Sequence, residues 1–202
     1  LGARRLPEAI AACLGNGGRE LKGKVRYPPQ QVPVDMSAVL GHEPVKRAIL
    51  AAAVGGMHVL LSGPPGCGKS LMAKAAPSIL PRLAESEALE VSRLWSAAGE
   101  LEDGKAIVFA PYVCVTPNTT QVGLIGGGAQ AKAIGAVVRA HRGILHIDEI
   151  QDMDRQVVDS LRGVLEDGVA TIVRQGIAAK FPARCWVIAT MNPCPCGWHG
   201  LY

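Results

Sequence analysis

Short apolar runs alternate with amphipathic segments along most of the 202-residue chain. Continuous apolar runs predict strands, whereas apolar positions that recur every three or four residues predict helices. Strands are predicted at residues 57–61, 107–110, 113–116, 144–147 and 185–190, and helices at 44–54, 71–76, 85–98, 129–140 and between a cap at Asp152 or Asp154 and Gly168. Strands that alternate with helices favour an α/β fold with a parallel sheet and right-handed crossovers.

A hairpin is predicted late in the chain. Two β-prone runs, 169–173 and 178–181, flank the turn residues Arg174, Gln175 and Gly176. Short strands on either side of a turn that contains glycine indicate an antiparallel β-hairpin. We therefore expect this hairpin to lie between the helix that ends at Gly168 and the last strand.

A glycine-rich segment, residues 63–70 with the sequence GPPGCGKS, lies between a predicted strand and a predicted helix. It matches the phosphate-binding pattern G-x-x-x-x-G-K-[ST] in full, in the setting that the pattern requires. Glycines permit backbone angles at which successive N–H groups point at a phosphate, and the start of the helix adds its positive end. Lys69 is predicted to bind the β- and γ-phosphates of ATP, and Ser70 to bind Mg²⁺. The predicted ATP-binding residues here are Gly63, Pro64, Pro65, Gly66, Cys67, Gly68, Lys69 and Ser70.

Polar residues follow two of the predicted strands. Asp148 and Glu149 come directly after residues 144–147, and Asn192 follows the strand at 185–190. A carboxylate at the carboxyl end of a buried strand, downstream of a phosphate loop, can hold Mg²⁺, which is the role predicted for Asp148. Glu149 is predicted to be the general base that activates water, and Asn192 to orient that water or contact the γ-phosphate.

The amino-acid composition indicates where the protein acts, but it says little about which reaction the protein performs. Hydrophobic residues make up 49% of the chain, which is enough for a core, and the net charge of +4 permits nucleic-acid binding without arguing for it. Six scattered cysteines, one of them in the phosphate loop, indicate reduced thiols and a cytoplasmic location. We find no signal peptide and no apolar run long enough to span a membrane, so no membrane partner is expected.

The pattern of polarity also predicts how the chain is organised. Residues 1–18 hold one short helical pattern closed by glycines, and residues 19–34 are polar and rich in proline, as in a linker. The compact domain is expected to cover residues 35–202. Because the chain begins with Leu and stops just after a motif, we expect it to be a fragment of a longer protein.

Taken together, GPPGCGKS, the strand before Asp148 and Glu149, and the strand before Asn192 resemble those of an AAA+ ATPase. The resemblance is closest to magnesium-chelatase-like AAA+ proteins of the ComM (YifB) competence type, and it covers roughly residues 35–200. The further segments that carry it read VLGHE at 39–43, LIGGG at 124–128, AHRG at 140–143, LEDG at 165–168 and MNPCPCG at 191–197. The resemblance implies a P-loop NTPase αβα sandwich with a parallel central sheet and β-hairpin insertions, with the helical lid missing from this chain.

The resemblance also implies roles for residues that the pattern alone does not assign. Val39 and Leu40 would border the adenine, and Asn192 would be the sensor residue. The hairpin would face the central pore of a homo-hexamer, which makes Arg174 at its tip a candidate DNA contact. Residues 1–18 would be the end of a preceding domain. The arginine finger would lie beyond the last residue, so these 202 residues alone should hydrolyse ATP weakly.

Two cysteines near the end of the chain and one histidine are the remaining candidate metal ligands. Cys194 and Cys196 supply only two of the four ligands of a structural zinc site, so free cysteines are the simpler interpretation and zinc is expected only in a longer parent protein. His146 stands where the family usually has an apolar residue. A single buried histidine is predicted to be a core residue rather than a ligand.

The function implied is that of a ring-forming ATPase that drives DNA processing of the branch-migration type. The ATPase subunit of a metal chelatase is an alternative that uses the same ATP chemistry, although the MNPCPCG and LIGGG segments favour the ComM-like protein. A non-hydrolysing nucleotide-binding module or fragment is a third possibility. The intact Glu149 argues against a degenerate site of that kind.

Overall fold

A computed structural model describes residues 32, 34–101, 105–127, 134–174 and 177–194 of the chain. The expected end of a preceding domain, and most of the expected linker at 19–34, lie outside these residues. Within them, four parallel strands form the central sheet, in the order β1-β6-β3-β2. The strands are β1 (Val59–Ser62), β2 (Tyr112–Val115), β3 (Ile144–Ile147) and β6 (Trp186–Met191). All of β3 is buried, as its mostly apolar sequence predicted.

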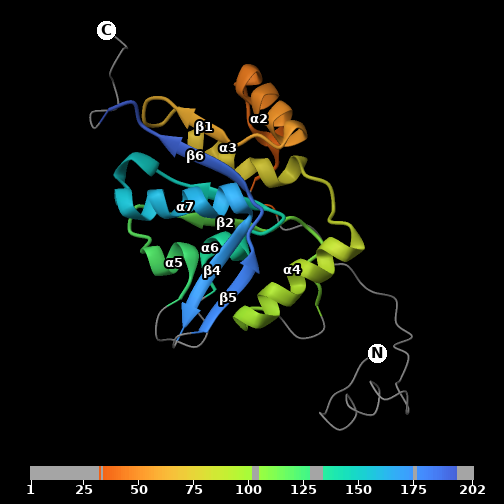
Figure 1. Cartoon of the computed structure of the whole chain (residues 1–202). Helices are drawn as coiled ribbons and strands as arrows, with labels where there is room; N and C mark the ends of the chain where they lie inside the picture. The colour runs from red at the N-terminus through yellow and green to blue at the C-terminus, as the bar shows by residue number, and fades with distance from the viewer. Residues whose placement is uncertain (1–31, 33, 102–104, 128–133, 175–176, 195–202) are drawn as a thin grey trace.

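Helices cover both faces of this sheet (Figure 1). The α-helices are α2 (Glu43–Gly55), α3 (Lys69–Ala75), α4 (Glu85–Ala98), α5 (Gln121–Ile125), α6 (Ala136–Arg139) and α7 (Arg155–Asp167), and the short 3-10 helices are η1 (Met36–Ala38), η2 (Ala76–Ile79) and η3 (Ile150–Asp152). On one face, α2 and α3 bury apolar side chains against Ile144 and Ile188. On the other, α5, α6 and α7 pack against Leu145 and Val187. The predicted αβα sandwich with a parallel central sheet is therefore confirmed.

The predicted hairpin is also confirmed, as a separate two-stranded sheet of β4 (Val169–Arg174) and β5 (Ile177–Pro182). Ala170 and Ile172 are buried, whereas Thr171 and Val173, which alternate with them, are exposed. This alternation gives the hairpin one face on the core and one face in solvent. The hairpin runs away from the central sheet (Figure 1), and its first strand contacts α5 and α7.

The predicted helix ends are set by capping residues. α4 covers the predicted residues 85–98. α7 begins after Asp154, whose Oδ1 accepts the N–H of Gln156 at 2.7 Å, and it ends at Gly168. Of the two caps that the sequence allowed, Asp154 is therefore the one used, while Asp152 belongs to η3.

The strand predicted at residues 107–110 is wrong. Within it, Phe109 makes only an isolated β-bridge. The backbone N–H of Ile107 is donated to Oγ of Ser92 on α4, at 2.9 Å, instead of to a neighbouring strand. The sequence of a four-residue apolar run does not show whether its backbone N–H groups will bond to a neighbouring strand or to a side chain on a helix.

The helix predicted at residues 129–140 is confirmed only over its last turn, as α6. Gly135 is extended there, and a Cβ at this position would lie 2.2 Å from the carbonyl carbon of Ile125, so the chain passes too close to α5 for a side chain. Residues 128–133 lie outside the described part. The sequence did not predict α5, which Thr120 caps with its side chain.

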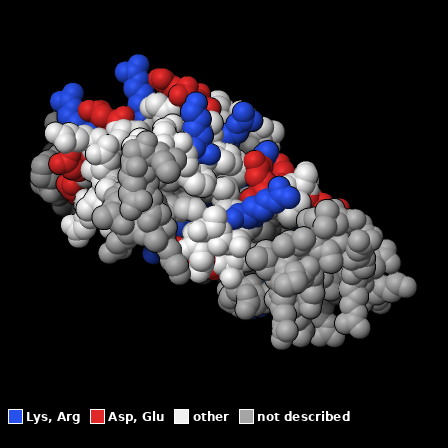
Figure 2. Space-filling view, turned by 60° about the horizontal axis from the view of Figure 1, so that its bottom comes forward, with Lys and Arg blue, Asp and Glu red and all other residues white. Residues whose placement is uncertain are grey.

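Charge on the described surface is mixed. On the face in Figure 2, Lys and Arg lie beside Asp and Glu rather than in one positive patch. On α7, for example, Arg162 pairs with Glu166 at 3.0 Å, one helical turn away. No helix in the described part of the chain is long and apolar enough to cross a membrane.

Candidate functional site

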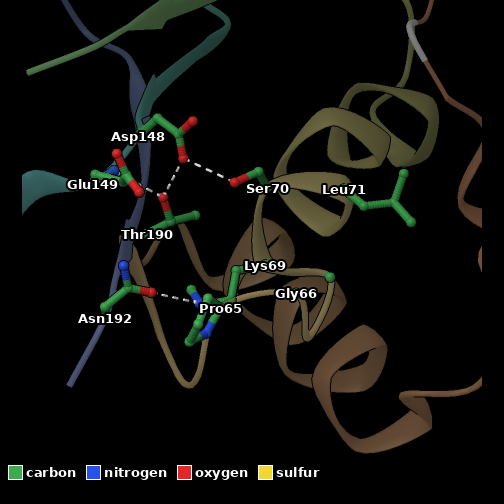
Figure 3. Close-up of a pocket in the computed structure, with 10 residues that line it drawn as sticks. Pro65, Gly66, Lys69, Ser70, Leu71, Asp148, Glu149, Thr190 and Asn192 are labelled. Carbon is green, nitrogen blue, oxygen red and sulfur yellow. Dashed lines mark hydrogen bonds between the residues drawn. The ribbon is translucent and has the colours of Figure 1, made fainter. Parts of the chain in front are cut away.

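The carboxyl ends of β1, β3 and β6 border a cavity of about 340 Å³ (Figure 3). Because parallel strands end at the same edge of a sheet, residues far apart in sequence meet there. The cavity is lined by Pro65, Gly66, Gly68, Lys69, Ser70, Leu71, Asp148, Glu149, Thr190 and Asn192.

The glycine-rich loop leaves β1 and enters α3 along one wall of the cavity. Gly66 and Gly68 adopt left-handed backbone angles, with φ of +76° and +87°. A side chain at either position would strain the backbone, so glycine is required by the conformation itself. The loop therefore brings bare backbone to the cavity, as a phosphate-binding loop does.

The ammonium group of Lys69 lies between this loop and the end of β6. Its Nζ donates to the carbonyl oxygens of Gly63 and Pro64, both at 2.7 Å, and to Oδ1 of Asn192 at 3.1 Å. Cys67 contacts the same Nζ through its Sγ, at 3.8 Å. The ammonium group of Lys69 and the side-chain amide of Asn192 therefore lie next to each other in the cavity.

Asp148 faces the same cavity from the end of β3. Its Oδ1 accepts hydrogen bonds from Oγ of Ser70 at 2.8 Å and from Oγ1 of Thr190 at 2.7 Å (Figure 3). Partial burial alone would raise the pKa of Asp148, but these two hydrogen bonds and nearby positive charge hold the pKa below its ordinary value. Asp148 is therefore an anion at neutral pH.

Glu149 has an unusual backbone. Its φ of +52° and ψ of +53° are left-handed, a conformation that few residues other than glycine and asparagine adopt. Its N–H is donated to Oγ1 of Thr190 at 3.2 Å, and its side chain is exposed at the cavity. The strained backbone holds a second carboxylate beside Asp148.

The sequence matches the family model described as magnesium chelatase, subunit ChlI, over residues 35–201. The chain belongs to the ChlI family. It is 39% identical over 163 residues to an uncharacterized protein of Mycobacterium tuberculosis, covering 80% of this chain and 32% of that protein. It is 33% identical over 166 residues to the competence protein ComM of Haemophilus influenzae, covering 82% and 32% of the two chains. The chain thus spans about a third of the length of these relatives.

Magnesium-chelatase subunits and solved structures also match this ChlI-family chain. A 38 kDa magnesium-chelatase subunit of Rhodobacter capsulatus is 32% identical over 177 residues, covering 78% of this chain and 49% of the subunit. A model of the complex between magnesium-chelatase subunits BchI and BchD superimposes with a TM-score of 0.62 and 27% identity, over 78% of this chain and 54% of that chain. NtrX of Brucella abortus, solved with ATP, matches with a TM-score of 0.52 at 22% identity over 84% and 34% of the two chains. The predicted resemblance and the AAA+ fold are confirmed.

Other predicted site residues lie away from the cavity. Val39 is buried in the core beside α2 and α3, and the side chain of Leu40 is 89% exposed. Neither lines the cavity, so an adenine contact by this pair stays a prediction. Arg174 ends β4 at the turn of the hairpin.

The zinc prediction concerns the last residues of the structure. Cys194 is partly buried, and Cys196 lies outside the described residues. In the part of the ChlI-family chain that is described, no three His, Cys, Asp or Glu side chains gather as metal ligands. Zinc binding by the cysteine pair stays a prediction.

One polar residue of the cavity, Thr190, was missed by sequence reasoning, whereas His146 is buried in the core as predicted. Thr190 precedes Asn192 by two residues, and alternation along a strand places both on the same face. A polar residue near the end of an apolar strand was the available signal. His146 is fully buried in β3, with Nδ1 2.7 Å from the Tyr112 hydroxyl and 3.4 Å from Sγ of Cys114.

Proposed function

We propose that this ChlI-family chain binds ATP with Mg²⁺ at the cavity and hydrolyses the γ-phosphate bond. One observation carries the proposal. Lys69 and Ser70 on one helix lie within hydrogen-bond distance of Asn192 and Asp148, which are 123 and 78 residues away in the sequence. A phosphate-binding loop, a metal-binding carboxylate and a polar strand end are thereby combined in one site.

The loop and its lysine would bind the phosphates. The backbone at Gly66 and Gly68 presents N–H groups without side chains, and the Lys69 ammonium supplies a full positive charge for the β- and γ-phosphates. Asn192 is next to that ammonium and so would contact the γ-phosphate or the attacking water. Phosphoryl transfer depends mainly on such positioning and on charge stabilisation.

The donor set fits Mg²⁺. The Ser70 hydroxyl and the ionised Asp148 carboxylate are 2.8 Å apart, and both are hard oxygen donors. Mg²⁺ bound with a nucleotide typically uses one or two such side chains and completes its shell with phosphate oxygens and water. The ion would neutralise charge that develops on the phosphate oxygens.

Glu149 would be the general base. Its carboxylate lines the cavity next to the metal-binding Asp148 but is exposed, so a water molecule can reach it. A base in this role accepts the proton of the attacking water as the bond to phosphorus forms. Glu149→Gln keeps the size of the side chain and removes this capacity.

We further propose that ATP hydrolysis drives DNA processing in a ring of subunits. Similarity to ComM supports this assignment, and the β4–β5 hairpin supplies a separate surface whose outer face is exposed, with Arg174 at its turn. The face in Figure 2 carries mixed charge rather than a broad basic surface, and the proposed contact is assigned to the hairpin.

A metal-chelatase ATPase is the alternative function, because magnesium-chelatase subunits are 28% and 32% identical to the chain. Both functions use the same ATP site, so only the response to DNA separates them. A non-hydrolysing nucleotide-binding module is the remaining alternative.

The test, made on the full-length protein because these 202 residues alone are expected to hydrolyse ATP weakly, is binding of fluorescent N-methylanthraniloyl ATP and hydrolysis of ATP, each with and without branched DNA. Lys69→Ala should abolish binding, and Glu149→Gln should keep binding but lower hydrolysis by about a hundredfold. Hydrolysis that rises with DNA would support the motor, and hydrolysis that ignores DNA would favour the chelatase function. Binding without hydrolysis would favour the non-hydrolysing module, and absence of Mg²⁺-dependent binding would contradict the proposal.

A further inference from the structure

A buried histidine stands directly behind the proposed metal site. His146 is 0% exposed in β3, and it is the polar residue in a strand whose other members are apolar. Its Nε2 has no hydrogen-bond partner among the described residues, yet it lies 3.7 Å from Oδ1 of Asp148. A buried polar atom without a partner destabilises a fold, so its place next to a functional carboxylate requires an explanation.

The contacts of the ring select one tautomer. The Tyr112 hydroxyl lies 2.7 Å from Nδ1 of His146, and burial raises the pKa of Tyr112, so the hydroxyl keeps its proton and can donate it to Nδ1. With Nδ1 as acceptor, the single ring proton is on Nε2 and faces the carboxylate. The opposite tautomer would place the lone pair of Nε2 against the negatively charged carboxylate of Asp148.

The two side-chain hydrogen bonds that Asp148 accepts among the described residues end on one oxygen. Ser70 and Thr190 donate to Oδ1, and Nε2 of His146 lies 3.7 Å from that same atom, beyond hydrogen-bond distance. We propose that His146, fixed by Tyr112, is a positioning residue for Asp148: the positive end of its Nε2–H dipole attracts Oδ1 inward and leaves Oδ2 for the Mg²⁺ of a bound nucleotide. This inference rests on the proposed function, because it assigns a role toward the same metal.

The packing of the strand supports a role beyond filling the core. In the sheet, His146 lies between Cys114 on β2 and Ile188 on β6, and the other member of its face in β3 is Ile144. An apolar side chain would pack there without leaving a polar atom unpaired. Partners that orient a metal ligand from behind are commonly worth a factor of 10 to 100 in metal affinity.

The experiment measures the ratio of N-methylanthraniloyl-ATP affinity in Mg²⁺ to that in EDTA, for the 202-residue chain. His146→Leu should lower this ratio about tenfold while the affinity in EDTA stays near that of wild type. His146→Gln, which keeps an N–H in reach of Asp148, should stay within about threefold of wild type. Tyr112→Phe, which removes the donor to Nδ1, should fall between the two.

Ile144→Val is the matched control, since Ile144 is buried on the same face of the same strand and has no polar side-chain atom. The inference is overturned if His146→Leu keeps the wild-type ratio, or if His146→Leu and Ile144→Val lower both affinities alike. A wild-type chain whose affinity does not depend on Mg²⁺ would overturn the proposed metal site itself, and this inference with it.

Discussion

At the scale of single residues, the Thr190 hydroxyl joins the two acidic residues of the site. It is 1% exposed, donates to Oδ1 of Asp148 and accepts the backbone N–H of Glu149. One oxygen on β6 therefore links the predicted metal ligand to the backbone of the predicted base. Neither the Asp148 carboxylate nor the Glu149 backbone could shift without breaking a bond to this buried group.

Replacing Thr190 by Val keeps the shape of the side chain and removes both hydrogen bonds. The variant should lose about 1–3 kcal/mol of unfolding free energy, because the N–H of Glu149 is left without its acceptor. Mg²⁺-dependent nucleotide affinity should fall by about tenfold. Chemical denaturation and nucleotide titration measure the two effects. Thr190→Ser, which keeps the hydroxyl, is the control, and equal behaviour of the two variants would show that the hydroxyl is unimportant.

Sequence reasoning could identify residues of the site that stand at fixed offsets from a glycine pattern or from a strand end. Lys69, Asp148 and Asn192 are of this kind, and the structure brings them to one cavity. Thr190 and His146 have no such offset. Their partners are decided by which strands are neighbours, and that follows from the register of β3 with β2 and β6.

At the scale of elements, Gly143 controls how the segment after α6 enters β3. A Cβ at this residue would lie 2.1 Å from the carbonyl oxygen of Pro111, the same oxygen that accepts the N–H of Ile144 at 2.8 Å. The close approach begins the pairing of β3 with β2. Here the requirement for glycine comes from a neighbouring backbone and not from its own angles.

Gly143→Ala should therefore destabilise the protein by about 3 kcal/mol, because backbone atoms of two strands would have to separate. Gly163→Ala is the comparison, since a Cβ at Gly163 in α7 meets nothing within 4 Å. That change should stabilise the protein by about 0.5–1 kcal/mol, as alanine favours a helix over glycine. Denaturation midpoints measure both, and similar midpoints for the two variants would contradict the assigned packing.

The elements that were predicted best from the sequence have residues that terminate them, such as a helix cap, a glycine or a charged side chain. α7 has a carboxylate cap and a terminal glycine, and β3 is a buried run that ends in acidic residues. The run at 107–110 and the helix α5 were the failures. Both are short, and tertiary contacts determine whether such segments form, as the Ser92 hydroxyl does for the former.

At the scale of the whole molecule, the alternation of strands and helices predicted the sandwich because parallel strands require crossovers. The strand order was not predictable in the same way. The last strand, β6, lies between the first strand and β3, which brings Thr190 and Asn192 between the phosphate loop and the acidic residues. Several strand orders are compatible with the same alternation of strands and helices in the sequence, so the order is determined by how the strands pack.

The protonation state of a buried histidine also affects the stability of the whole molecule. His141 is 1% exposed, and its Nδ1 accepts the N–H of Arg184 at 3.0 Å. Burial lowers the pKa of His141 and outweighs the opposing effect of Glu90, whose carboxylate lies 3.3 Å from Nε2. The folded protein therefore keeps this histidine neutral at a pH where the unfolded chain protonates it.

Stability should consequently fall as the pH is lowered from 7.5 to 5.5. A histidine whose folded pKa lies below its unfolded value of about 6.5 stabilises the fold above that pH and loses this stabilisation as the pH falls, by about 1 kcal/mol over this range. Urea denaturation at several pH values measures it. His141→Asn keeps an acceptor for the Arg184 N–H and should make the profile less steep, whereas an unchanged slope would exclude His141 as a source.

The left-handed backbone of Glu149 means that the residue best for stability at this position differs from the residue that the proposed activity needs. Glycine would relieve about 1 kcal/mol of strain at this exposed position without removing a buried contact. The more stable molecule would then be the one without its proposed base. Engineering that selected variants of this chain only for heat resistance would favour the loss of Glu149, and it would yield a protein that folds well but hydrolyses ATP far more slowly.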